Sequence, residues 1–359
     1  MYKYDIVCIG LAIMDSIIKG FEPEPVSATG FRAESGSLNV GGDAVNESIA
    51  SAKLGMKTAI LCSLGRDFAG DIILEELERY GVNTELVVRS AEHPTPVTTI
   101  FVTEDGNRKS ITNSAHNYNF HPEQYMSRFT GTRAVMLGSL FRAPFNDPDV
   151  IMKVVSAAAD RDAIVFADTK LPNFRKLSLD DISHILPKID FITPNEDEGK
   201  YYTGKDSPEE MADVFLEKGA QNVIIKLGGR GCFFKSHDLS LHVPAYRIDT
   251  IDATGAGDNF IAGFASEIIK GSTAGDALRF ASACGAICST AVGAGAAVRN
   301  RDQVLKFLAD KKEWSIQNRA IQKNIYWSPL HQEMKSQHGT HLMSCQISWT
   351  QPAVLPPVR

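Results

Sequence analysis

One run of seven residues carries the strongest chemical signal in the chain: Asp252-Ala253-Thr254-Gly255-Ala256-Gly257-Asp258. The apolar residues that follow it at helical spacing are Ile261, Phe264, Ala265 and Ile268. This period predicts a helix that begins near Gly257. Small residues before a helix let backbone N–H groups approach an anion, and the helix dipole adds partial positive charge there. Gly255, Ala256 and Gly257 therefore predict an anion hole for a phosphoryl group in transfer.

Asp258 falls in the first turn of that helix, beside the predicted anion hole. A carboxylate there would repel a bound phosphate unless it faced the incoming hydroxyl instead. Facing the hydroxyl, it can accept the proton as the bond to phosphorus forms. The structural alternative is a stabilising first-turn acid after a glycine turn. We favour a general base, because seven specific residues precede a strongly periodic helix.

The run resembles the C-terminal signature of the PfkB-type, ribokinase-like carbohydrate kinases. A second motif, Gly41-Gly42-Asp43-Ala44-Val45-Asn46, resembles the N-terminal Gly-Gly-x-x-x-Asn signature of that family and opens the first long helix. Glycines let a sugar approach the backbone, and Asn46 offers both a donor and an acceptor to a hydroxyl. Taken alone, the motif would be a glycine turn with an Asn in the first helical turn. The resemblance implies substrate contacts from Gly41, Gly42, Asp43 and Asn46.

Two further positions on the substrate side match the family. Asp15 lies five residues after Gly10, beyond the end of the first expected strand. By resemblance its carboxylate binds sugar hydroxyls, and its place beyond a strand's carboxyl end favours this role over that of a solvated loop acid. Arg108 belongs to the turn Gly106-Asn107-Arg108, and the resemblance implies that it reaches the substrate from this turn.

A third motif, Asn195-Glu196-Asp197-Glu198, follows the strand that ends at Thr193-Pro194. It is similar to the family's Asn-x-x-Glu motif, which organises Mg²⁺ near the phosphates, partly through water. Mg²⁺ favours oxygen ligands and keeps several waters, and Asn195 and Glu198 are the matching positions. The structural alternative is an acidic helix N-terminus, into which Glu196 and Asp197 fit.

The resemblance also marks a nucleotide side and a cation loop. Lys226-Leu227-Gly228-Gly229-Arg230-Gly231 is similar to the family's nucleotide-side glycine turn, although it could equally be an ordinary hairpin turn. Asp168-Thr169-Lys170 matches an Asp-x-Lys or Asp-x-Asn position, where Lys170 either meets ATP phosphates or is solvated. Asp252 and Thr254, with carbonyls of the 293–297 segment, are implied to hold a monovalent cation such as K⁺. The implied nucleotide-binding positions are Lys170, Asn195, Lys226, Gly228, Gly231 and Thr254.

These motifs need a parallel sheet to bring them together. Short apolar runs that predict buried strands cover residues 6–10, 58–63, 134–138, 163–168, 190–193 and 223–227. Amphipathic runs that predict helices cover residues 45–54, 69–80, 149–159 and 208–218. Their alternation predicts an α/β fold, with a mostly parallel central sheet and helices on both faces. Ligands of such sheets bind beyond the carboxyl ends of the strands.

Two stretches break the alternation, at about 11–40 and 95–112. The second predicts a hairpin with a turn at Asp105-Gly106. Together they predict a small β-sheet that serves as a lid, as a dimer interface, or as both. We therefore expect a ribokinase-like kinase domain over 1–312 and a C-terminal extension over 313–359. From about residue 327 the chain is rich in Gln, His, Ser and Pro without period, so we expect its last part to be poorly ordered.

Composition and charge exclude several classes of protein. The hydrophobic fraction of 43% is that of a globular domain, and the net charge of −6 comes without a strong basic patch. Nucleic acid is therefore not an expected partner. The N-terminal apolar run is too short for a signal peptide core, and no run is long enough to span a membrane. We expect a cytoplasmic protein.

The sequence thus predicts an ATP- and Mg²⁺-dependent kinase that phosphorylates a sugar hydroxyl. Ribose, fructose and 2-keto-3-deoxygluconate stay open as substrates. Asp43 stands where ribokinases usually have lysine and some fructokinases a small residue, which weakens a close assignment to either. A nucleoside kinase of the same fold is the first alternative. A non-catalytic sugar- or nucleotide-binding protein is disfavoured by the intact Asp258, and a dehydrogenase by residues 10–15, which lack Gly-x-Gly-x-x-Gly.

Overall fold

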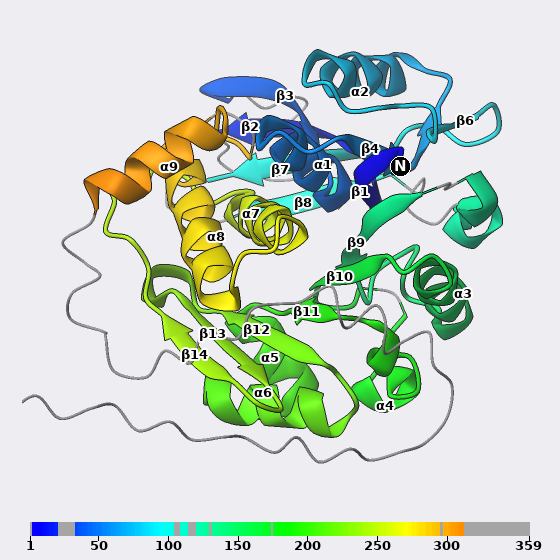
Figure 1. Ribbon diagram of the computed structural model, residues 1–359. Helices are drawn as coiled ribbons and strands as arrows, with labels where there is room; N and C mark the ends of the chain where they lie inside the picture. Colours follow the sequence, from blue (N-terminus) through cyan, green and yellow to red (C-terminus); the bar gives the residue numbers. More distant parts are fainter. Residues whose placement is uncertain are drawn as a thin grey trace, which may run out of the picture. The chain divides into compact units, whose positions relative to one another are not determined.

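A mostly parallel sheet forms the centre of the molecule (Figure 1). Among the described residues it has eight strands in the order β14-β13-β12-β11-β10-β9-β1-β4. The strands from β4 to β12 pair in parallel, and β13 and β14 add an antiparallel hairpin at one edge. The bounds are β1 Tyr4–Ile9, β4 Thr58–Leu61, β9 Thr132–Leu140, β10 Ile164–Thr169, β11 Phe191–Thr193, β12 Asn222–Lys226, β13 Cys232–Ser236 and β14 Ser240–Val243. Each of the six strands expected from apolar runs is present.

This computed structural model describes residues 2–20, 33–103, 108–113, 120–128, 131–173, 175–294 and 297–311. All of them fall within one compact unit. The turn expected at Asp105-Gly106, the side chain of Arg108 and the chain from 312 onward lie outside the described residues.

Helices cover both faces of the sheet, as the alternating pattern predicts (Figure 1). Successive strand residues point to opposite faces, so that Val7 and Ile9 join one buried cluster while Ile6 and Cys8 join the other. On the first face lie α3 Pro148–Ala159, α4 Leu179–Ile182, α5 Glu196–Thr203 and α6 Pro208–Glu217. On the second lie α1 Asp43–Lys53, α2 Phe68–Arg79, α7 Ala256–Ile269 and α8 Ala274–Cys288. The helix α9 Arg301–Asp310 packs on α8.

A separate four-stranded sheet is built from the two stretches that break the alternation. Its order is β3-β2-β7-β8, where β2 pairs with β3 antiparallel and with β7 parallel. The bounds are β2 Ile13–Lys19, β3 Ser35–Gly41, β7 Val97–Val102 and β8 Arg108–Thr112. Because β2 follows β1 and β3 leads into α1, this small sheet is joined directly to the carboxyl edge of the central sheet.

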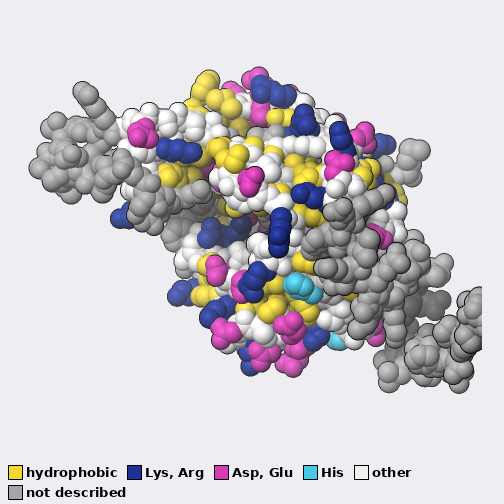
Figure 2. Space-filling view, turned by 90° about the vertical axis from the view of Figure 1, so that its left-hand side faces the viewer, with side chains coloured by type: hydrophobic (Ala, Val, Ile, Leu, Met, Phe, Trp, Pro, Cys, Tyr) yellow, Lys and Arg dark blue, Asp and Glu magenta, His cyan; other side chains and the backbone are white. Residues whose placement is uncertain are grey.

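Several short elements complete the described structure. They are the two-stranded parallel sheet of β5 Ser63–Gly65 and β6 Val88–Ser90, and the 3₁₀ turns η2 Pro122–Arg128, η3 Leu186–Lys188 and η4 Gly228–Arg230. No helix among the described residues combines the length and the apolar character that crossing a membrane requires. On the face shown in Figure 2, basic side chains lie interspersed with acidic ones around patches of apolar surface.

Candidate active site

The start of α7 has a glycine in the left-handed region and no side-chain cap. Gly255 caps the helix with φ of 75°, in the left-handed region, and a Cβ there would overlap Ala294. No side chain caps this helix, so its first N–H groups are left for a ligand. Asn259 donates hydrogen bonds to the carbonyl oxygens of Gly255 (2.9 Å) and Ala294 (2.8 Å), which tie the neighbouring loop to the helix start. The anion hole expected at Gly255, Ala256 and Gly257 stays a prediction, with which this uncapped helix start is compatible.

Asp258 connects the two signature motifs. Its side chain is buried, with 5% of the residue exposed, and its Oδ2 accepts a 2.7 Å hydrogen bond from Nδ2 of Asn46. Burial raises the pKa of Asp258 to about 7, and the negative charge of Asp43 acts in the same direction, whereas the Lys170 cation and the Asn46 hydrogen bond act against it. A carboxylate of this pKa can take up and release a proton near neutral pH.

Two partly buried lysines lie near this centre, Lys226 at the end of β12 and Lys170 just after β10. Lys226 forms an ion pair with Asp168, whose Oδ1 also accepts a 2.7 Å hydrogen bond from Oγ1 of Thr193. Nζ of Lys170 lies 3.4 Å from Oδ2 of Asp43, and that oxygen also accepts a hydrogen bond from Ser139. Asp43, which departs from the family pattern, is thus paired with the lysine that the sequence associates with ATP phosphates.

Asp15 on β2 lies beside the glycines of the first motif, at the end of β3. A Cβ on Gly41 would overlap the carboxylate of Asp15, and one on Gly42, at φ of 98°, would overlap the carbonyl of Leu11. Burial raises the pKa of Asp15 to about 6, and the charge of Asp43 adds to this. The structure therefore brings Asp15, Asp43 and Asn46 to one place. Arg108 begins β8 in the same small sheet, and its side chain is outside the described residues.

Asn195 and Glu198 form a capping box at the start of α5. Oδ1 of Asn195 accepts from the N–H of Glu198, and Oε2 of Glu198 accepts from the N–H of Asn195, both at 2.9 Å. Oγ1 of Thr169 adds a 2.8 Å hydrogen bond to the same carboxylate oxygen. Burial raises the pKa of Glu198, the Lys226 cation opposes this, and the charge of Asp168 adds to it. The motif therefore caps the start of α5, which was its structural interpretation. Its amide and carboxylate oxygens, near Asp168, are also ligand types that Mg²⁺ prefers.

The second predicted cation site lies in the loop before α7. Oδ1 of Asp252 accepts hydrogen bonds from N–H and Oγ1 of Thr254, at 3.0 and 2.6 Å, and Oδ2 accepts from N–H of Gly293 at 3.0 Å. Asp252 therefore braces the two segments that the resemblance assigns to a monovalent cation. Gly295 and Ala296 of the second segment lie outside the described residues.

A cavity of about 590 Å³ opens on the other side of the anion hole. Gly231, at φ of 97°, closes one wall, since a Cβ there would overlap the carbonyl of Val243. Lys226, Gly228, Ala256 and Gly257 also line the cavity, which places the glycine turn beside the helix start. The lining residues that the sequence reasoning missed are Ala245, Tyr246, Arg247, Ile248, Thr250, Ser282, Gly285, Ala286 and Ser289. The last four share one face of α8, and their small size at helical spacing is the signal that could have found them.

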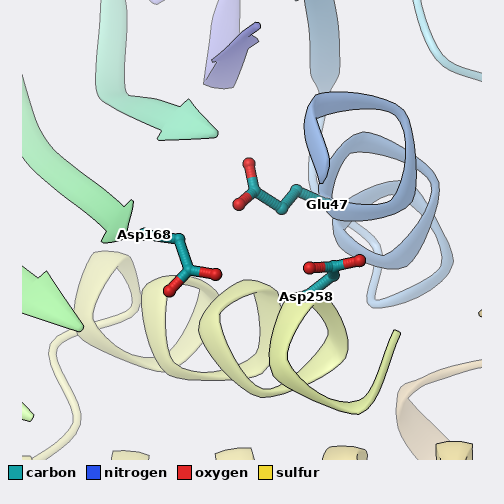
Figure 3. Close-up of side chains that lie close together, drawn as sticks. All are labelled: Glu47, Asp168 and Asp258. Carbon is teal, nitrogen blue, oxygen red and sulfur yellow. The ribbon is translucent and has the colours of Figure 1, made fainter. Parts of the chain in front are cut away.

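Three carboxylates from different elements converge beneath the site (Figure 3). They belong to Glu47 on α1, Asp168 on β10 and Asp258 on α7, and their oxygens lie within 4.8 Å of one another. Sequence reasoning missed Glu47. An acid at the centre of an otherwise apolar and small helix face, between Ala44 and Ala50, was its only signal.

Comparisons with known proteins relate this chain to carbohydrate kinases. Residues 3–301 match the family model described as pfkB family carbohydrate kinase. A ribokinase of Haemophilus influenzae is 26% identical over 276 residues, which cover 75% of this chain and 87% of that protein. A 2-dehydro-3-deoxygluconokinase of Bacillus subtilis is 28% identical over 291 residues, with coverage of 77% and 88%. The structure of an Arabidopsis thaliana ribokinase complexed with ribose and ATP has the same fold, with a TM-score of 0.73, 24% identity and coverage of 86% and 99%.

Proposed function

The chain belongs to the pfkB family of carbohydrate kinases, and we propose that it transfers a phosphoryl group from ATP to a sugar hydroxyl with Asp258 as the general base. The observation that carries this role is the buried Asp258 carboxylate in the first turn of α7, beside a helix start that no side chain caps. Such a helix start offers N–H groups to the transferring phosphoryl group, and the carboxylate offers an acceptor to the hydroxyl.

The proposed reaction uses the two sides of the α7 start. The nucleotide occupies the cavity behind Gly231 and Gly257, with its phosphates toward the uncapped N–H groups. The sugar hydroxyl lies on the Asp258 side. As the bond from its oxygen to phosphorus forms, Asp258 takes the proton and the bond to the leaving ADP oxygen breaks. Asn46 holds the Asp258 carboxylate in orientation through its 2.7 Å hydrogen bond.

The charges on the acceptor side favour a neutral sugar. Asp15 and Asp43 can accept hydrogen bonds from adjacent sugar hydroxyls, and Asn46 can both donate and accept. Lys170 is already paired with Asp43. A sugar acid such as 2-keto-3-deoxygluconate would meet these carboxylates with like charge. We therefore place ribose and fructose ahead of it.

We propose Asn195 and Glu198 as the residues that organise Mg²⁺, with Asp168 beside them. Their carboxylate and amide oxygens suit this ion, which when bound offsets the charge on the transferring phosphoryl group. Asp252 and Thr254 are our candidates for a monovalent cation such as K⁺. Because the phosphate donor is ATP, we further propose that the enzyme works in the cytoplasm.

The small sheet is proposed as a lid over the acceptor and as the surface of a homodimer. Asp15 lies on β2 of this sheet, so movement of the sheet would close or open the acceptor side. Leu38 and Ile111, on β3 and β8, are 64% and 67% exposed, which leaves apolar surface for a partner copy. Sedimentation of the full chain would test the dimer: a monomer at all concentrations would contradict it.

A substrate panel tests the proposed function. We expect ATP-dependent ADP release with one neutral sugar from a panel of pentoses, hexoses, sugar acids and nucleosides. A parallel preparation carrying Asp258→Asn measures any contaminating kinase. Release with a nucleoside alone would replace the sugar with that acceptor, and release with none would contradict a kinase of small molecules.

A further inference from the structure

Glu47 is a buried acid that the proposed reaction does not use. It follows Asn46 on α1, and none of its surface is exposed. Neither Oε1 nor Oε2 has a hydrogen-bond partner within the part of the chain that the structure describes. Buried polar atoms are nearly always partnered, so this pair calls for a physical explanation. Figure 3 shows the side chain directed toward Asp168 and Asp258.

Acids surround Glu47 from several elements. The Asp168 and Asp258 carboxylates, on β10 and α7, lie within 4.8 Å of it, and Asp43 stands one turn earlier on its own helix. Facing it from β1 is the Cys8 thiol, whose pKa is raised well above the usual range, first by burial and then by the charge of Glu47. An ionised Glu47 would therefore add a buried negative charge within 4.8 Å of the Asp168 and Asp258 carboxylates.

The nearby cations are already engaged. The Lys226 ammonium on β12 is paired with Asp168, and the Lys170 ammonium, just after β10, lies 3.4 Å from Asp43. Within the described structure, Glu47 thus has no ion pair of its own. An ionised carboxylate that is buried without a counter-ion is strongly disfavoured, and such a group normally takes up a proton instead.

We propose that Glu47 carries a proton in the working enzyme and donates it as a hydrogen bond to the Asp258 carboxylate, beside Asp168, so that it positions the general base. The inference rests on the proposed role of Asp258. The pKa of Glu47 supports it, because burial, and then the charges of Asp168, Asp258 and Asp43, raise that pKa well above its ordinary range, and only Lys226 opposes them.

The atoms available fit this arrangement. Oδ1 of Asp168 accepts hydrogen bonds from Lys226 and Thr193, and Oδ2 of Asp258 accepts one from Asn46. Within the described structure, the second oxygen of each aspartate takes part in none of these bonds, and a neutral carboxylic acid has one O–H to give. A hydrogen bond to the ionised form of Asp258 favours that form. Glu47 would thus keep the base charged and fixed without reacting itself.

A divalent cation between the three carboxylates would be the other way to neutralise them. Direct ligation would withdraw electron density from the Asp258 carboxylate, which the general base needs for the hydroxyl proton. A protonated Glu47 is therefore favoured over a bound cation. Binding of a cation is one of the outcomes that the experiments below distinguish.

Infrared difference spectroscopy of the nucleotide-free enzyme tests the proton directly. We expect the wild-type minus Glu47→Gln spectrum at pH 7 to contain the C=O band of a protonated carboxylic acid. The matched control is Glu267→Gln, because Glu267 is also buried but is ion-paired with Arg301, so that its removal should change only carboxylate bands. A carboxylate band alone for Glu47 would overturn the proposal. If Glu47→Gln folds poorly, wild-type enzyme with ¹³C-carboxyl glutamate reports the same band.

The pH profile separates a positioning role from a structural one. With the best sugar of the panel, Glu47→Gln should leave the acid limb of kcat/KM in place, because the amide still donates. Glu47→Leu removes the donor to the ionised Asp258, so its acid limb should move up by about one pH unit. A downward shift in Glu47→Gln would mean that a negative charge had been removed, and it would overturn the proposal.

Two outcomes distinguish the remaining explanations. Titration of nucleotide-free enzyme with Mn²⁺, followed by electron paramagnetic resonance, should show no tight site that depends on Glu47. One stoichiometric site that is lost in Glu47→Gln would replace the proton by a cation. If instead Asp258→Asn kept full turnover, Asp258 would not be the general base. The infrared spectrum would still show independently whether Glu47 is protonated.

Discussion

The two sides of the α7 start differ in the types of residue that form them. The proposed nucleotide side is a cavity walled by glycines, small residues of α8 and Tyr246, with Lys226 and Arg247 as its charged members. The acceptor side gathers Asp15, Asp43, Glu47 and Asp258 with one lysine, Lys170. The proposed function therefore implies that ATP is recognised by shape and backbone, and that the acceptor is recognised and activated by charged groups.

This difference predicts where substitutions act. Removing one polar side chain from the nucleotide side should change ATP affinity modestly, because backbone groups and shape remain. On the acceptor side each carboxylate has its own task, so a single isosteric change should alter one kinetic parameter strongly and leave ATP binding intact. The predictions that follow probe this contrast in order of decreasing effect.

The largest effect is expected for Asp258→Asn. Loss of the proton acceptor should lower kcat by about a thousandfold, within the usual range for a general base. ATP affinity, measured by calorimetry, should stay close to that of the wild type. The matched control is Asp276→Asn, a first-turn acid of α8 that is paired with Arg279 away from the site, and it should keep its turnover. Near-normal turnover of Asp258→Asn would show that Asp258 is not the general base, and the proposed difference between the two sides would be wrong.

Glu198→Gln should act on the proposed Mg²⁺ requirement. The Mg²⁺ concentration for half-maximal turnover should rise about tenfold or more, the usual cost of disturbing the groups around a metal. Glu196→Gln is the control, since Glu196 lies on the same helix in an exposed pair with Arg230. An equal Mg²⁺ requirement in both variants would reduce Asn195 and Glu198 to a helix cap.

Asp15→Asn should affect the acceptor alone. Loss of a charged hydrogen-bond acceptor should raise KM for the sugar about tenfold. KM for ATP should not change, because Asp15 lies on the small sheet, away from the nucleotide cavity. A parallel rise in both constants would show that Asp15 supports the fold of the site and does not bind the sugar.

The smallest effect is expected for deletion of residues 327–359. The family match ends at residue 301, and the chemistry assigned here lies before it. Turnover and both KM values should therefore equal those of the full chain. Loss of activity in the truncated enzyme would contradict this prediction and would show that the tail contributes to folding or to turnover.

Local patterns in the sequence predicted the strands and both signatures, because a buried strand or a glycine turn is encoded by neighbouring residues. Pairings over long separations were not predictable in this way. The Asn46–Asp258 hydrogen bond joins positions 212 residues apart, and the Lys170–Asp43 pair depends on where β10 ends relative to α1. Glu47 was missed because a single acid in a helix has no spacing to reveal its neighbours. The small residues on one face of α8 are a pattern in the sequence, but their place in the wall of the cavity depends on how α8 packs on α7.

The central claim is that an ionised, buried Asp258 accepts the hydroxyl proton, and the pH dependence of kcat/KM for the sugar tests it most directly. Burial raises the pKa of Asp258 from 3.8 to about 7, so the protonated form, which cannot act as a base, accumulates as the pH falls through 7. We predict an acid limb near pH 7 with a loss of about tenfold per pH unit below it, and the same limb in Asp15→Asn. A rate that stays constant down to pH 5 would contradict the account.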